Sequence, residues 1–156
     1  LLGGPHARDF LAEADGLGFD GAKWFSDRIG QAAATKLCRS VMIKGVEALL
    51  TESMLAARRY GVEGVVLESL SDLLPLPDWP ATARYMISRS LEHGTRRAEE
   101  MREAARTVEE ANVEPLMSEA IAQRQDWAAD FSDAHARQDL GRMLDDINSE
   151  IERRLR

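Results

Sequence analysis

Lys36 is the residue whose type and position could most readily do chemistry in this chain. It lies near the start of a mostly apolar segment, residues 29–60, that contains no proline. On a helical wheel of about 100° per residue, six polar side chains fall in one sector roughly 80° wide, whereas Arg39, Glu52 and Arg59 lie outside it. They are Lys36, Ser40, Lys44, Glu47, Thr51 and Arg58. Because an unpaired buried charge is unfavourable, this polar stripe must meet solvent, a polar partner or a ligand.

Two kinds of role fit Lys36. A lysine that transfers protons needs a pKa below its ordinary value of about 10.4, which burial and a neighbouring cation can produce. Lys44 lies two helical turns along the stripe, and Ser40, one turn along, could hydrogen-bond a substrate oxygen. The same spacing also fits an ordinary surface lysine in an ion pair, with Glu47 as a candidate partner.

His93 and Arg97 form a second candidate group. They are four residues apart and would share one face of a helix, with Arg96 about 100° away. Arginines bind carboxylates and phosphates through paired hydrogen bonds, so the group suits a small anion. The alternative is a solvated helix, because the charged residues between 92 and 103 can pair among themselves.

The composition excludes several classes of protein. Of 156 residues, 44% are hydrophobic and 30% charged, which is typical of a soluble globular domain. A formal charge of −7 argues against nucleic-acid binding. No apolar run approaches the roughly 20 residues of a membrane span, and the first residues lack a signal-peptide pattern. We therefore expect a cytoplasmic protein with no nucleic-acid or membrane partner.

Cysteine and histidine usage argues against a metal centre. Cys38 is the single cysteine, which excludes an internal disulfide, and its place on an apolar helix face predicts a buried, inert thiol. The three histidines show no metal-ligand spacing, so no metal site is expected. A nucleophile elbow, a P-loop and a zinc motif are also missing from the sequence.

Periodicity and capping residues predict a mainly α fold, a multi-helix bundle around one long central helix. A short strand is expected at 22–26, and no other strand. The expected helices are 5–14, 29–60 before Gly61, 62–74, one from Trp79 to about 92 capped by Asp78, 95–112, 115–130, and 134–153 capped by Ser132 or Asp133.

The run from Gly30 to Lys36 resembles the start of the C-terminal helical domain in the 3-hydroxyacid dehydrogenase and 6-phosphogluconate dehydrogenase-like superfamily. In those proteins the chain leaves the last Rossmann strand, passes a glycine and enters a long helix with an essential lysine six residues later. Trp24–Ser26 would be that strand. Ala32 and Ser40 stand where the family usually has a second glycine and an asparagine.

Segments 36–49 and 93–101 resemble an uncharacterised 6-phosphogluconate dehydrogenase-like subgroup, and the resemblance covers about residues 3–130. It implies that residues 1–28 are the end of a nucleotide-binding domain, a short N-terminal remnant of a Rossmann-type α/β domain. Residues 29–156 would be the C-terminal helical substrate and dimerisation domain. The resemblance also implies that NAD or NADP would be bound mainly by a missing N-terminal domain, with Gly30 as a cofactor contact.

The resemblance also implies a reaction. Lys36 would take the proton from a substrate hydroxyl while a hydride passes to the nicotinamide. Ser40 would replace the usual asparagine beside the substrate, and Arg97 with His93 would hold an anionic group. From the residues alone a second possibility stays open, a non-catalytic all-α homodimeric binding or scaffolding domain in which the Lys36 stripe is a ladder of ion pairs.

The last predicted helix carries one apolar stripe, which could pack against either of two surfaces. Its apolar residues recur at three- and four-residue spacing and include Leu140, Met143, Leu144, Ile147 and Ile151. The stripe either packs on its own domain or forms an arm on a second subunit. We expect a homodimer that buries part of 29–60 or 134–156, because apolar surface of this extent usually marks an interface.

Overall fold

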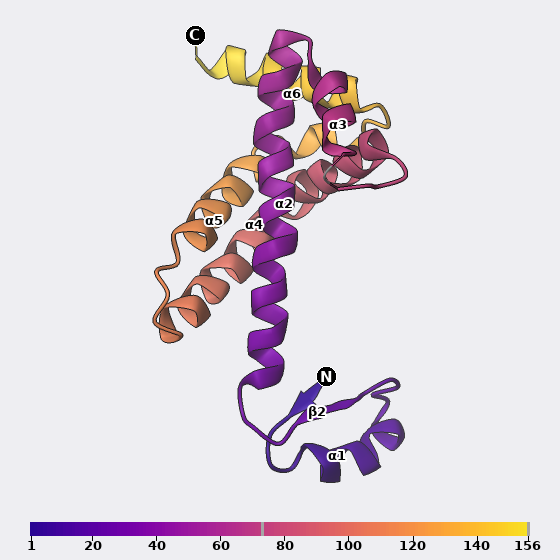
Figure 1. The fold of residues 1–156 in the computed structure, drawn as a ribbon, viewed down its shortest axis with the longest axis vertical. Helices are drawn as coiled ribbons and strands as arrows, with labels where there is room; N and C mark the ends of the chain where they lie inside the picture. Colours follow the sequence, from indigo (N-terminus) through magenta and orange to yellow (C-terminus); the bar gives the residue numbers. More distant parts are fainter. Residues whose placement is uncertain (73, 156) are drawn as a thin grey trace.

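The computed structural model describes residues 1–72 and 74–155 and is mainly α-helical, as the sequence predicts. Its elements are β1 (Leu2–Gly3), α1 (Ala7–Ala14), β2 (Trp24–Ser26), α2 (Gln31–Tyr60), α3 (Glu63–Leu70), α4 (Trp79–Glu110), α5 (Leu116–Ala129) and α6 (Leu140–Arg154). Helix α2 runs along the molecule, from the N-terminal unit at one end to α3 and α6 at the other (Figure 1). Helices α4 and α5 lie across its middle (Figure 1).

Glycines set both ends of α2. The helix starts after Gly30, whose φ of 86° is left-handed, and stops at Gly61, with φ of 69°. The Gly61 N–H donates back to the carbonyls of Ala57 and Arg58, which caps the last turn. Glycine adopts this backbone without the strain that a Cβ would bring. The predicted central helix, 29–60, is therefore confirmed with bounds that differ by two residues at one end.

The N-terminal unit is a small strand–helix–strand arrangement. Strands β1 and β2 pair in parallel, with Leu2 opposite Trp24, and α1 connects them. The expectation of a single strand was wrong, because β1 has two residues and is too short to show any periodicity. Parallel strands joined by a helix are the unit of Rossmann-type sheets, so a short α/β arrangement at the N-terminus is observed as predicted. Its boundary at residue 28 stays a prediction.

The main hydrophobic core lies where α2, α4 and α6 meet. Its fully buried side chains include Met54 from α2, Ile87 and Leu91 from α4, and Met143 and Ile147 from α6. The apolar stripe of the last helix therefore packs on its own domain. A smaller hydrophobic cluster joins α2, α4 and α5. Its buried residues are Ala48, Met101, Ala104, Ile121 and Ala122.

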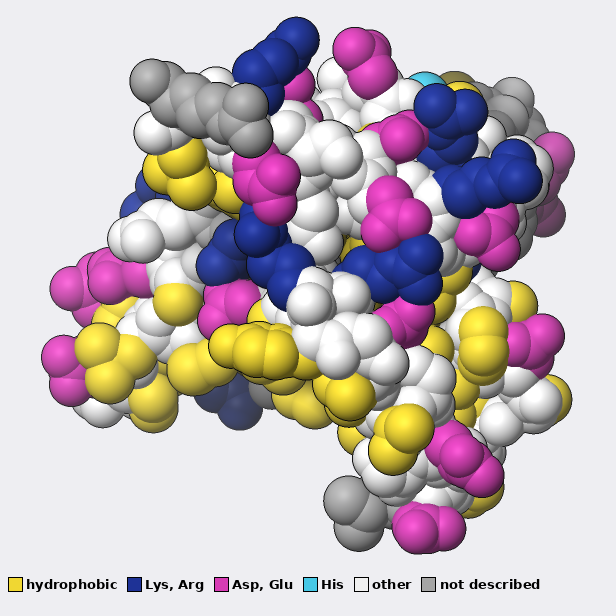
Figure 2. All heavy atoms as spheres, turned by 90° about the horizontal axis from the view of Figure 1, so that it is seen from above, with side chains coloured by type: hydrophobic (Ala, Val, Ile, Leu, Met, Phe, Trp, Pro, Cys, Tyr) yellow, Lys and Arg dark blue, Asp and Glu magenta, His cyan; other side chains and the backbone are white. Residues whose placement is uncertain are grey.

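Salt bridges between helices reinforce the end of the bundle formed by α3 and α6. The Arg58 guanidinium donates to both carboxylate oxygens of Asp145, each at 2.8 Å, and also contacts Glu63. Figure 2 views the molecule from this end and shows basic and acidic side chains interleaved on the surface. Exposed pairs of this kind individually add little to stability.

Three predicted helix boundaries need correction. The helices expected at Trp79 to about 92 and 95–112 form one element, α4, with a kink at His93 (φ −124°, ψ 15°). The helix expected at 62–74 ends at Leu70; Leu73 and Arg156 lie outside the described residues. The last helix starts at Leu140, because Asp139 caps it and residues 132–136 form a 3₁₀ turn. Asp78 caps α4 as expected, accepting from the Ala81 N–H at 2.9 Å.

Gly94 sets how closely α4 approaches α5. It is buried, and a Cβ at this position would lie 2.3 Å from the Gln125 carbonyl oxygen and 2.9 Å from the Ala129 nitrogen. Both are backbone atoms, so the clash is relieved only if one helix moves. The close contact therefore requires glycine, one residue after the kink in α4.

We expect Gly94→Ala to lower the free energy of unfolding by about 1–3 kcal/mol or more, the typical cost of overpacking a core. Gly64→Ala is the matched control, because Gly64 lies in helix α3 and an added methyl group there would meet nothing within 4 Å. That control should be neutral or stabilising by up to about 1 kcal/mol. Urea denaturation followed by circular dichroism measures both, and equal midpoints would contradict the close-packing argument.

Candidate functional site

The polar stripe of α2 is buried against neighbouring helices at its centre and exposed at its start. Ser40, Lys44, Glu47 and Thr51 are 7%, 8%, 3% and 0% exposed, respectively. Lys36 is exposed. From the sequence, the stripe could meet solvent, a polar partner or a ligand. In the structure its buried part meets polar partners, chiefly from α4.

An outer ion pair joins Lys44 to Glu100 of α4. Lys44 Nζ lies 2.7 Å from Glu100 Oε2 and also donates to Ser40 Oγ at 3.2 Å. Arg96 contacts the other oxygen of the same carboxylate. Burial acts to raise the pKa of Glu100, but the Lys44 hydrogen bond and the charges of Lys44, Arg96 and Lys36 outweigh it and hold this pKa below its usual value.

An inner ion pair joins Glu47 to Arg97, also of α4. Both side chains are almost fully buried, and Arg97 Nη1 donates to Glu47 Oε2. Gln125 of α5 donates to the same oxygen at 3.4 Å. Burial raises the pKa of Glu47, opposed by the charges and hydrogen bonds of Arg97, Lys44 and Gln125. This pair therefore ties α2, α4 and α5 together at one point.

The predicted site residues are only partly brought together. Lys36 and Ser40 share one face of α2, and Lys36 is close enough to act electrostatically on Glu100. Arg97 is occupied by Glu47, so the suggested partnership of Glu47 with Lys36 was wrong. His93 lies at the α4 kink with Nε2 3.2 Å from Glu92.

Two members of the cluster were not singled out from the sequence. Glu100 and Gln125 both contact the stripe, yet Glu100 was counted among the self-pairing charges of its helix and Gln125 was not considered. A signal for Glu100 existed, since it lies three residues after Arg97 and four after Arg96 on one face. Gln125 lies in another helix, and only the packing of α5 brings it to Glu47.

The predicted cofactor contact lies directly before the first residue of α2. Gly30 is the one candidate contact, and a Cβ there would meet nothing within 4 Å; its positive φ is accounted for by the start of α2. No group of three metal-binding side chains occurs among residues 1–72 and 74–155. Cys38 is exposed rather than buried, because the first turns of α2 extend beyond the bundle (Figure 1).

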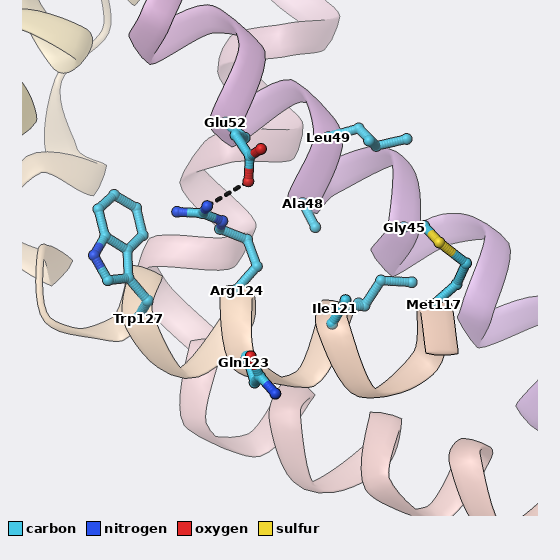
Figure 3. Close-up of a pocket in the computed structure, with 10 residues that line it drawn as sticks. Gly45, Ala48, Leu49, Glu52, Met117, Ile121, Gln123, Arg124 and Trp127 are labelled. Atoms are coloured by element: carbon cyan, nitrogen blue, oxygen red, sulfur yellow. Dashed lines mark hydrogen bonds and ion pairs between the residues drawn. The ribbon is translucent and has the colours of Figure 1, made fainter. Parts of the chain in front are cut away.

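A cavity lies on another side of α2. It has a volume of about 540 Å³ and lies between α2 and α5. Gly45, Ala48 and Leu49 line it from α2, and Met117, Ile121 and Trp127 from α5 (Figure 3). The Glu52–Arg124 ion pair closes one end (Figure 3). None of Lys36, Ser40, His93 and Arg97 contributes to it.

Comparisons with known proteins show what this chain resembles. A family model described as a domain of unknown function (DUF1932) matches residues 57–128. A conserved hypothetical protein from Sinorhizobium meliloti 1021 is 34% identical, with a TM-score of 0.79 over 94% of this chain and 50% of its own length. No curated protein matches the chain.

A second solved structure is that of conserved protein MTH1747, of unknown function, whose structure is described as similar to 3-hydroxyacid dehydrogenases. It is 33% identical, with a TM-score of 0.65 over 82% of this chain and 48% of its own length. The chain thus spans about half the length of the solved structures it matches. The predicted resemblance is confirmed: residues 57–128 match the DUF1932 family model, and the fold is similar to a structure described as similar to 3-hydroxyacid dehydrogenases. None of its described helices is long and apolar enough to cross a membrane.

We expect Glu100→Gln to lower the free energy of unfolding by about 1–3 kcal/mol at neutral pH, because Lys44 and Arg96 lose a charged acceptor. The pKa of Glu100 is lowered on folding, so its contribution is present above the unfolded value of 4.5 and is lost as pH falls through the folded value. The stability difference between the wild type and Glu100→Gln should therefore shrink in acid.

Urea titrations from neutral to acidic pH measure this difference directly. Glu103→Gln is the matched control, because Glu103 is exposed on the same helix. A difference for Glu100→Gln that stays constant with pH, or one no larger than that of the control, would contradict the assignment of the ion pair.

Proposed function

We propose that this chain is the substrate-binding and dimerisation part of a NAD(P)-dependent oxidoreductase that acts on a hydroxyl group of a small anionic substrate. Lys36 would be its general acid/base. The similarity to 3-hydroxyacid dehydrogenase-like proteins supports a dehydrogenase-like role. The observation that carries the finer proposal is the exposed Lys36 one helical turn from Ser40, on the part of α2 between the N-terminal unit and the bundle (Figure 1).

The charges around Lys36 suit an anion. Lys44 and Arg96 contact the Glu100 carboxylate and Lys36 acts on it electrostatically, which leaves an excess of positive charge there in an acidic protein. Ser40 would hydrogen-bond a substrate oxygen. Arg97 and His93 were the predicted anion-binding residues, and each would have to exchange its present carboxylate partner to do so.

In this proposal Lys36 holds or moves the proton of the substrate hydroxyl. Its Nζ accepts that proton on oxidation and returns it on reduction. A nicotinamide cofactor supplies hydride chemistry to such enzymes, and we propose that its binding residues lie mainly outside this chain, with Gly30 at most at the edge. The cytoplasmic location also stays a prediction.

Lys36→Met in the complete enzyme should reduce turnover by on the order of 10²-fold or more, the range for loss of a general acid/base. Folding should be unchanged, because the Lys36 side chain is exposed. Turnover is measured from reduced nicotinamide formed with a panel of small hydroxy acids. Lys23→Met, at the other exposed lysine, is the control, and near-wild-type turnover of Lys36→Met would refute the mechanism.

A second candidate is the non-catalytic all-α homodimeric binding or scaffolding domain. The Lys44–Glu100 and Glu47–Arg97 pairs favour it, because they satisfy the buried part of the stripe without any ligand. The two candidate functions differ in the role of Lys36. An enzyme would require it, whereas the Lys44–Glu100 and Glu47–Arg97 pairs form without it. A complete protein that lacks oxidoreductase activity with every hydroxy acid, and whose Lys36→Met variant is unaltered in stability and association, would support the scaffold.

We also propose a homodimer that uses the α2–α5 face. Met42, Leu49 and Met117 are 69%, 62% and 60% exposed on this side, and Leu49 and Met117 line the cavity of about 540 Å³. Exposed apolar groups that adjoin a cavity are typical of interfaces. The apolar stripe of α6 is already buried within the chain, which leaves α2 as the more suitable of the two predicted segments.

Leu49→Glu should therefore shift the protein from dimer to monomer, because it places a charge at the centre of the proposed interface. Light scattering coupled to gel filtration, over a series of concentrations, measures the change. Val65→Glu on α3 is the control, since Val65 is 68% exposed and outside this face. A wild type that is monomeric throughout the series would show that the α2–α5 face does not dimerise.

A further inference from the structure

We propose that Lys44, held by Glu100, is a positioning residue that fixes the Ser40 hydroxyl as a hydrogen-bond donor toward the bound ligand. This inference rests on the proposed function, since it concerns the same ligand site. It adds two residues of this chain to that site, and it states that Ser40 donates its proton to an acceptor atom of the ligand.

The geometry of the three side chains supports this arrangement. Lys44 Nζ is 2.7 Å from Glu100 Oε2 and 3.2 Å from Ser40 Oγ, so one ammonium bridges the carboxylate and the hydroxyl. The side chains of Lys44 and Glu100 are 10% and 26% exposed, which limits competition from water. Arg96 holds the other oxygen of Glu100 and fixes the carboxylate from its far side.

The donors and acceptors around Ser40 then set the direction of its hydroxyl. An ammonium group only donates, so Ser40 Oγ must accept from Lys44 and its own proton must go elsewhere. The other helical hydroxyls on α2 behave differently. Thr35 donates to the Gln31 carbonyl at 2.9 Å and Thr51 to the Glu47 carbonyl at 2.7 Å. Among the described contacts Ser40 makes no such bond, so its proton is free for a ligand.

The consequence concerns specificity. The asparagine usual at this position in the proteins that this chain resembles has both a donor and an acceptor. Lys44 occupies one of the two acceptor lone pairs of Ser40 Oγ and leaves the hydroxyl proton for the ligand. We therefore propose that this proton is donated to an acceptor atom of the ligand, such as a carboxylate, carbonyl or phosphate oxygen. The positive charge of Lys44, hydrogen-bonded to the same hydroxyl, strengthens that donor.

The hydrogen bonds of Lys44 can be tested without any ligand by observing its ammonium group. The chain contains only three lysines, at 23, 36 and 44, so their signals are easily assigned. Nitrogen-15 NMR of the lysine ammonium groups should show one slowly exchanging signal, from Lys44, assigned by its loss in Lys44→Met. Ser40→Ala should shift this signal, and Glu100→Gln should speed its exchange with water. A Lys44 signal that is unaltered in Ser40→Ala would overturn the proposal.

A double-mutant cycle on ligand binding tests the positioning role. The probe is 3-hydroxypropanoate, with its dissociation constant measured by NMR titration of the chain. Ser40→Ala and Lys44→Met should each weaken binding by on the order of tenfold, the range for hydrogen bonds to charged groups. In the Ser40→Ala background, Lys44→Met should add little, because Lys44 acts through Ser40. Lys44→Arg should restore part of the loss, and Lys23→Met is the matched control.

Two results would overturn the inference. Additive effects of Ser40→Ala and Lys44→Met would show that Lys44 acts as an independent cation, and a wild type that does not bind the probe would remove the ligand role of Ser40. Lys44→Met/Glu100→Gln is made in parallel, so that a Glu100 carboxylate without its Lys44 partner does not confuse the comparison. Failure of the proposed function is read separately, from the turnover of Lys36→Met in the complete enzyme.

Discussion

The burial of polar side chains between α2 and α4 is the constraint on which the rest of this structure depends. A charge taken out of water is strongly unfavourable unless a partner compensates it, and the penalty for breaking such a pair exceeds the gain from making it. Glu47 with Arg97 and Lys44 with Glu100 meet this condition. Both pairs are satisfied only when the two helices cross at one register, so they select that register among the many that apolar packing alone would allow.

The close contact of α4 and α5 at Gly94 contributes to the same cluster of polar side chains. It brings Gln125 near enough to reach Glu47, which adds an uncharged donor to the inner ion pair. The kink at His93 comes immediately before this contact, and the helix continues beyond it to present Arg97 and Glu100 to α2. The polar cluster is thus held by three helices, whereas Lys36, at the exposed start of the stripe, is not needed to hold any of them.

This separation between the buried and exposed parts of one stripe bears on function. The buried pairs have a structural explanation and need no ligand, which is why they alone cannot distinguish an enzyme from a scaffold. Lys36 and the Ser40 hydroxyl have free hydrogen-bonding capacity next to an excess of positive charge. The similarity to 3-hydroxyacid dehydrogenase-like proteins suggests which chemistry this capacity would serve. The apolar α2–α5 face is the surface that we propose for association.

The sequence by itself determined the mainly α class, the length of α2 and the presence of a narrow polar stripe on it. These features follow from local rules, the helical period and the glycines at 30 and 61, which act between neighbours in the chain. It also carried the family resemblance, through the spacing of Gly30 and Lys36 and the segment 93–101. Only the tertiary structure decided which partner each polar residue has. Arg97 pairs with Glu47 across fifty positions, and Cys38 is exposed because the start of α2 leaves the bundle, and neither fact is encoded in local periodicity.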